Sequence, residues 1–176
     1  MMSNRKPPGL EPAEASSLQA LLAEEEGAYR RLLRLAVRQN RYLRQQDLVR
    51  LEANAAEWRR FLPRAETARA SRESYLVGLG ERHDIGRSWL SMSRLARNTR
   101  GDHGRDLRDG LRVWEETTGE LMRQNSLNGM LARFCLGLVD EETAILCRGM
   151  TGRDGCYDAR GGERKGACAG VIIRKA

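Results

Sequence analysis

The sequence has no long hydrophobic run. Its longest apolar stretch, residues 134–139, is already interrupted by Gly137. Because a membrane-spanning helix needs ~20 consecutive apolar residues, we expect no membrane insertion. The N-terminal segment carries Arg5 and Lys6 without an apolar run behind them, which argues against a secretory signal peptide. We therefore expect a cytoplasmic protein.

Patterns that carry metal binding or catalysis are also missing. The four cysteines are 12, 9 and 12 residues apart and form no CxxC pair, whereas zinc sites bring ligands at short spacing. No glycine-rich loop follows a strand-like run, and His103 has no serine or cysteine beside it in the sequence. We expect no metal, no cofactor and no enzymatic activity, and reduced thiols in the cytoplasm. The cysteines are Cys135, Cys147, Cys156 and Cys168.

Proline is nearly absent from the body of the chain. Three of the four prolines lie within the first twelve residues, and only Pro63 follows them. β-Branched residues are scarce and aromatic residues make up 5% of the 176 residues. Since proline breaks helices and β-branched residues favour strands, this composition predicts an all-α protein.

Apolar residues recur at helical spacing in two early segments. Ser16 or Ser17 can cap the first helix, and Asp47 after the turn at residues 45–47 can cap the second. Pro63 lies inside the second segment, where it either kinks the helix or forces a restart. The first stripe is Leu18, Leu22, Tyr29, Leu32, Ala36 and Leu43; the second is Leu48, Leu51, Ala55, Trp58, Leu62, Ala65, Arg69, Arg72, Leu76 and Leu79.

Two further helices are expected in the second half. A short one spans residues 85–97 with Trp89, Leu90 and Leu95 inward, and a long one follows the loop around Gly101 and Gly104. The stripe of the long helix reads Leu111, Trp114, Thr118, Leu121, Asn125, Asn128, Ala132, Cys135 and Val139. Steps that alternate between 3 and 4 residues are typical of helices packed at shallow angles.

These elements predict three regions. Residues 1–14 form a flexible leader, residues 15–148 a helical bundle, and residues 149–176 a mobile tail that holds seven of the 18 glycines. The expected fold is an elongated antiparallel bundle of three long helices plus one short helix.

Two asparagines and two arginines lie on the apolar stripes. Asn125 and Asn128 form either a satisfied polar layer, with Arg72 opposite, or a notch that receives a partner's backbone. Arg69 and Arg72 must pair, extend to solvent, or face an absent partner, because a buried unpaired arginine is costly. In the tail, Tyr157 lies among glycines, either as a turn that pins the tail or as a docking anchor.

The net charge of +7 is unevenly distributed. Residues 81–148 carry 11 basic and 11 acidic groups, whereas residues 30–72 hold 12 arginines against four acidic residues. This arginine-rich segment is either a solvated face or a stripe that meets a phosphate backbone.

The ordered set of motifs resembles the FlgN-type flagellar export chaperones. The paired asparagines followed by leucine and the downstream tyrosine element carry most of the resemblance. The full set is Leu21, Leu22, Glu25, Tyr29, Leu32 and Leu33, then Leu43, Asp47, Leu51 and Arg72, then residues 124–131, and last residues 157–161. In the family, glycine often follows the tyrosine directly, whereas here three residues intervene before Gly161.

The resemblance implies a chaperone of the flagellar type III secretion system. Such proteins bind terminal helical segments of hook–filament junction proteins and deliver them to the membrane export gate. The implied partners are therefore these client proteins and the flagellar export gate or ATPase complex. We expect client contacts at Asn125, Asn128, Leu131, Phe134 and Leu138, because an amphipathic client helix fits a groove with apolar anchors. Tyr157 and Gly161 would contact the client or the export gate.

Two other functions remain as alternatives. One is an arginine-rich helical nucleic-acid-binding protein that uses the segment 30–72, which predicts binding that weakens steeply with salt. The other is a self-associating coiled-coil structural protein, which predicts an oligomer without any partner.

Overall fold

The computed structural model describes residues 9–86 and 90–150, and in these ranges it contains four helices and no strand. They are α1 (Pro12–Gln45), α2 (Leu48–Arg82), α3 (Met92–Asn98) and α4 (Gly101–Met150). The all-α class is thereby confirmed. The chain divides into two compact units, residues 1–131 and residues 132–176, and α4 contributes to both. Trp89 and the glycine-rich tail from residue 151 lie outside the described residues.

Helix α1 begins earlier than the sequence pattern predicts. Pro12 occupies the first turn, and the backbone N–H of Glu11 donates to Oε2 of Glu14 at 3.3 Å. Proline suits this position because its missing N–H would have no helical partner there. Ser17 does not cap the helix, since its hydroxyl donates to the carbonyl of Ala13 inside α1. Leu10, ahead of the helix, is already buried.

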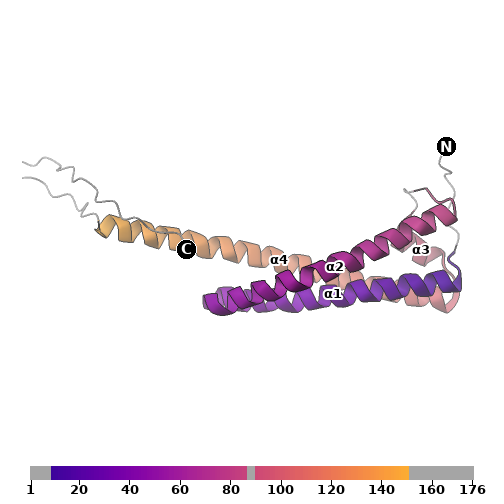
Figure 1. Cartoon of the computed structure of the whole chain (residues 1–176), viewed down its shortest axis with the longest axis horizontal. Coiled ribbons are helices and arrows are strands. Elements are labelled where there is room, and N and C mark those ends of the chain that lie inside the picture. Colours follow the sequence, from indigo (N-terminus) through magenta and orange to yellow (C-terminus); the bar gives the residue numbers. More distant parts are fainter. Residues whose placement is uncertain (1–8, 87–89, 151–176) are drawn as a thin grey trace, which may run out of the picture. The chain divides into compact units, whose positions relative to one another are not determined.

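A tight turn joins α1 to α2. Gln46 adopts a left-handed conformation with φ of 54°, and the Asp47 carboxylate accepts from the backbone N–H of Arg50 at 3.0 Å, which confirms Asp47 as the cap. The two helices pack side by side (Figure 1). Nδ2 of Asn54 on α2 donates to the carbonyl of Leu35 on α1 at 3.2 Å. Pro63 lies inside α2 without ending it, so the helix does not restart there.

The first part of α4, up to residue 131, packs on the same unit. Thr117 hydrogen-bonds to Glu26 and Asn128 to Ala36, so the sequence separations are 91 and 92 residues. A nearly constant separation means that this part of α4 runs in the direction of α1. Helix α3 is shorter than expected and begins after Ser91, whose hydroxyl accepts from the backbone N–H of Arg94.

Two apolar clusters form the core of the first unit. One gathers at the end where α1 begins and includes residues of all four helices; the other lies between the second half of α1, α2 and Leu121. The first comprises Leu10, Ala15, Leu18, Leu22, Leu76, Leu79, Ile85, Leu95, Ala96, Leu107 and Leu111; the second comprises Leu32, Leu35, Ala36, Ala65 and Leu121.

The buried face of α2 differs from the predicted stripe. Asn54 and Ala68 are buried, whereas Leu48, Leu62 and Arg69 are exposed. The prediction followed apolar residues at heptad steps, but a straight helix of 3.6 residues per turn drifts away from a 3.5-residue repeat. Small and polar residues therefore occupy buried positions that the pattern passes over.

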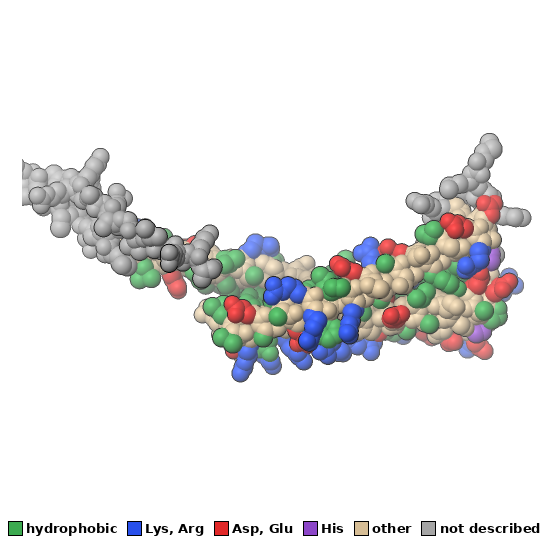
Figure 2. Space-filling model, viewed as in Figure 1, with side chains coloured by type: hydrophobic (Ala, Val, Ile, Leu, Met, Phe, Trp, Pro, Cys, Tyr) green, Lys and Arg blue, Asp and Glu red, His purple; other side chains and the backbone are tan. Residues whose placement is uncertain are grey.

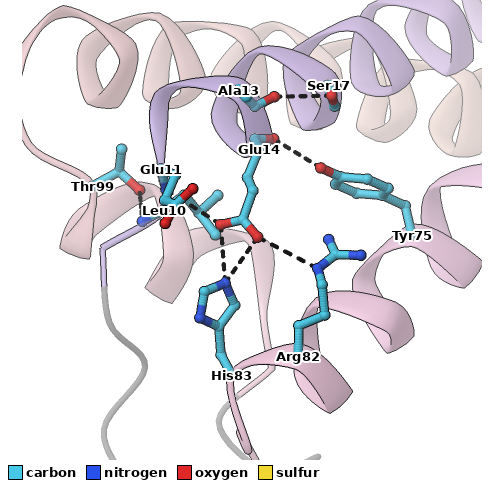
Figure 3. Close-up of polar contacts among 9 residues, drawn as sticks. All are labelled: Leu10, Glu11, Ala13, Glu14, Ser17, Tyr75, Arg82, His83 and Thr99. Carbon is cyan, nitrogen blue, oxygen red and sulfur yellow. Dashed lines mark hydrogen bonds and ion pairs between the residues drawn. The ribbon is translucent and has the colours of Figure 1, made fainter.

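A polar cluster joins the ends of α1 and α2 around Glu14 (Figure 3). Its carboxylate lies 2.9 Å and 3.0 Å from Nε2 of His83 and 3.5 Å from Nε of Arg82. The hydroxyl of Tyr75 donates to the backbone carbonyl of Glu14 at 3.3 Å. Burial by itself raises the pKa of Glu14, but hydrogen bonds from His83 and from the Glu11 N–H, together with nearby positive charge, lower it below 4.5 overall. The charged form of Glu14 thus holds the two helix ends together.

This lowered pKa predicts a pH-dependent contribution to stability. Since the folded protein has the lower pKa, Glu14 stabilises the fold above pH ~4.5 and loses its effect as the pH falls through the folded value. We expect Glu14→Gln to lower the free energy of unfolding at pH 7 by about 1 kcal/mol or less, as for other partly exposed ion pairs. Urea unfolding of both proteins between pH 7 and pH 3 measures this. A difference that stays constant to pH 3 would contradict the assignment.

Candidate client-binding helix

A buried ion pair lies where α1, α2 and α4 meet in the first unit. Nε of Arg72 donates to Oε2 of Glu25, and Nη2 lies 3.3 Å from Oε1 of the same carboxylate. Glu25 is fully buried, and the guanidinium lies 5.3 Å from the ring of Trp114 on α4. Burial, and then the hydrogen bond and charge of Glu25, raise the pKa of Tyr29 to about 12. The choice that the sequence left open for Arg72 is thereby decided in favour of pairing.

Arg69, the other arginine of the predicted stripe, lies on the surface. It pairs with Glu73 at 2.8 Å, one turn further along α2. Exposed pairs of this kind add little to stability. Neither arginine therefore faces a missing partner in the described structure.

Asn128 anchors α4 to α1. Its Nδ2 donates to the carbonyl of Ala36 at 2.8 Å and to Oε1 of Gln39 at 3.0 Å, and its Oδ1 accepts from Nδ2 of Asn40 at 2.9 Å. Asn128 is therefore part of a satisfied polar layer, and the opposing groups come from α1 rather than from Arg72. Asn125, by contrast, is exposed.

The polar layer predicts different stabilities for two asparagine variants. We expect Asn128→Ala to lower the free energy of unfolding by about 1–3 kcal/mol, because it leaves buried polar partners unpaired. Asn125→Ala should change it by less than about 0.5 kcal/mol, as for other exposed positions. Guanidinium unfolding followed by circular dichroism compares the two. Equal losses in the two variants would show that Asn128 is not an anchor.

The second unit presents apolar side chains to solvent. Every side chain described between residues 136 and 148 is exposed, and Phe134 is 64% exposed. Contiguous exposed apolar surface is unusual on a protein that has no partner. The large exposed apolar residues of this unit are Phe134, Leu136, Leu138, Val139, Ile145 and Leu146.

These side chains fall on two sides of the helix. Since each residue advances by about 100° around the axis, Phe134, Leu138 and Ile145 share one side, as do Leu127 and Leu131 before them. Cys135, Val139 and Leu146 continue instead the line of Leu121 and Asn128, which is buried in the first unit. Leu131, Phe134 and Leu138, predicted as client contacts, thus lie on one apolar stripe of α4, and Asn125 lies off it.

The predicted client contacts cover only part of this stripe. Leu127 and Ile145 belong to it by their spacing of 7 residues from Phe134 and Leu138, with 47% and 61% exposure. The sequence pattern places Ile145 beside the predicted stripe together with Leu131, Phe134 and Leu138, but neither Ile145 nor Leu127 was predicted as a client contact. Tyr157 and Gly161, the predicted docking element of the tail, lie outside the described residues.

The comparisons with known proteins agree with this description. The family model described as FlgN protein matches residues 14–165, which includes nearly all of the four helices. The chain belongs to the FlgN family. Membership gives a role in flagellum assembly as an export chaperone, and confirms the resemblance seen in the motifs. No curated protein and no solved structure matches the chain significantly.

The family is one of chaperones rather than of enzymes. Within the described helices, no segment combines the length and apolar character that crossing a membrane requires. Among the same residues, no three histidine, cysteine or acidic side chains converge as metal ligands would.

Proposed function

We propose that the protein is a cytoplasmic chaperone that binds the terminal helical segments of hook–filament junction proteins. In this role it prevents their premature assembly and delivers them to the flagellar export gate. An elongated antiparallel bundle of its three long helices would form the scaffold. Family membership supports the general role, and the exposed apolar stripe of α4 supports capture of a helix.

The stripe is the observation that carries the proposal. Leu131, Phe134 and Leu138 present apolar side chains at successive turns, which is the spacing an amphipathic client helix matches. Burial of this surface by a client removes apolar area from water and provides the main driving force. Asn125 and Asn128 remain predictions as client contacts; Asn128 would have to release α1 to serve as one. Tyr157 and Gly161 remain predicted contacts for the client or the gate.

A calorimetric titration tests the proposal. The full chain is titrated with the terminal helical segment of a hook–filament junction protein at two salt concentrations, and separately with duplex DNA. We expect a one-to-one complex that survives high salt, with a negative heat-capacity change from apolar burial. No client binding together with salt-sensitive DNA binding would favour the nucleic-acid alternative. A concentration-dependent oligomer that excludes the client would favour the self-associating coiled coil.

A further inference from the structure

The turn between α1 and α2 carries an exposed surface that client binding does not use. We define the hairpin tip as residues 34–50, the last three turns of α1 and the start of α2. Leu48 and Val49 begin α2 with 69% and 79% exposure, and Val37 on α1 is 50% exposed. The Asp47 side chain caps α2 by accepting from the backbone N–H of Arg50, so Leu48 and Val49 lie in a fixed first turn of the helix.

Arginines surround these apolar residues. The hairpin tip contains five arginines and one acidic residue, which gives it a net charge of +4. The Asp47 carboxylate forms an ion pair with Arg50, and Nη1 of Arg38 lies 3.4 Å from Oε2 of Glu57. Among the described residues no carboxylate lies within ion-pair distance of Arg34 or Arg44. The tip therefore presents cationic groups that its own unit leaves uncompensated.

The positive charge is local. Residues 101–148 of α4 carry six arginines against nine acidic residues, a net charge of −3. Figure 2 shows blue side chains gathered over the half of α1 and α2 nearest to their turn, and few at the opposite end of those helices. A charge separation of this kind orients a protein toward an anionic surface.

We propose that the hairpin tip docks on an anionic membrane surface. Arginine side chains meet the headgroup phosphates, and Leu48 and Val49 enter the boundary between headgroups and acyl chains. A nucleic-acid duplex would use the arginines but offers no apolar phase for two adjacent aliphatic side chains. A bilayer rich in anionic lipid accepts both features at once, which is why we favour it. Unlike the proposed client site, this site depends on no residue of α4.

Flotation of the full chain with vesicles tests the proposal. We compare vesicles of phosphatidylcholine alone with vesicles in which about a third of the lipid is phosphatidylglycerol. Binding is expected only to the anionic vesicles, with weakening at high salt. The variant Arg34→Gln/Arg41→Gln/Arg44→Gln should partition about 100-fold more weakly, since each arginine near an anionic surface contributes about fivefold. Leu48→Ser/Val49→Ser should also lose most binding while keeping all the charge.

Two matched variants control for general effects. Arg105→Gln/Arg112→Gln/Arg123→Gln removes the same charge from exposed positions on α4, and Leu62→Ser/Val77→Ser removes exposed apolar residues from the middle and end of α2. Both should bind the anionic vesicles like the parent chain, and client titration should be unchanged in all four variants.

Three outcomes would overturn the proposal. The first is the absence of binding to anionic vesicles by a chain whose helicity is intact. The second is salt-sensitive binding of duplex DNA that the arginine variant loses, together with vesicle binding that Leu48→Ser/Val49→Ser leaves unchanged, which would indicate a nucleic-acid surface. The third is a concentration-dependent dimer that Leu48→Ser/Val49→Ser abolishes, which would indicate a second copy of the chain. None of these outcomes bears on client capture by α4, so the two proposals fail separately.

Discussion

Glu25→Ala is expected to lower the free energy of unfolding by about 3–5 kcal/mol, the loss typical of breaking a buried ion pair. Glu25 is fully buried and is the carboxylate that accepts both hydrogen bonds of the Arg72 guanidinium. Its removal leaves the guanidinium between three helices with the face of Trp114 and the half-exposed carboxylate of Glu73, 3.9 Å from Nη2, as its remaining neighbours. Arg72→Ala should cause a loss of similar size, because it leaves the Glu25 carboxylate buried and unpaired.

Guanidinium unfolding with a matched surface pair measures the effect. The double variant Arg112→Ala/Glu116→Ala removes an exposed ion pair on α4 that includes neither buried partner, and it should cost about 1 kcal/mol or less. Replacing both buried partners by apolar residues, as in Glu25→Leu/Arg72→Met, should recover most of the loss, since no charge then stays buried without a partner. If Glu25→Ala proved no more harmful than the surface variant, the ion pair would not hold the three helices together.

Leu131→Asp/Leu138→Asp is expected to abolish client binding while the protein stays helical. The two aspartates would place charge on the apolar stripe that the client helix is proposed to cover, and burying an unpaired carboxylate is strongly unfavourable. Central apolar anchors of an interface contribute 2 kcal/mol or more, so we expect an affinity loss of about 30-fold or greater. Calorimetric titration with the terminal helical segment of a hook–filament junction protein measures the loss, and circular dichroism reports helicity.

Two single variants on α4 distinguish client binding by one face of the helix from nonspecific binding by any exposed apolar side chain. Phe134→Asp changes a stripe residue, whereas Leu136→Asp changes one that projects about 160° away from Leu138 around the helix. Both side chains are 64% exposed in the structure, so neither variant should unfold the first unit. Only Phe134→Asp should weaken client binding. Equal weakening by both, or unchanged affinity of the double aspartate variant, would contradict a sided client site.

The helical class of this protein is readable from its sequence alone. The scarcity of proline after residue 12 and the apolar residues at steps of 3 and 4 predict long helices, and Asp47 marks the turn between the first two. These are local properties, because helix capping and amphipathicity depend on residues within one or two turns. The motif pattern also indicated the family, because short motifs in a fixed order can be recognised in a sequence without knowing which residues contact one another.

The partners of the polar residues were decided only by the tertiary structure. The sequence indicated that Arg72 and Asn128 lie on apolar stripes, and one interpretation placed them opposite each other. In the structure Arg72 pairs with Glu25 and Asn128 with α1, near Ala36 and Asn40. Periodicity shows which face of a helix is apolar, but the turns and core packing set how far one helix slides along the next. The same reason explains why Leu48, the first residue of the predicted stripe of the second helix, faces solvent at the hairpin tip.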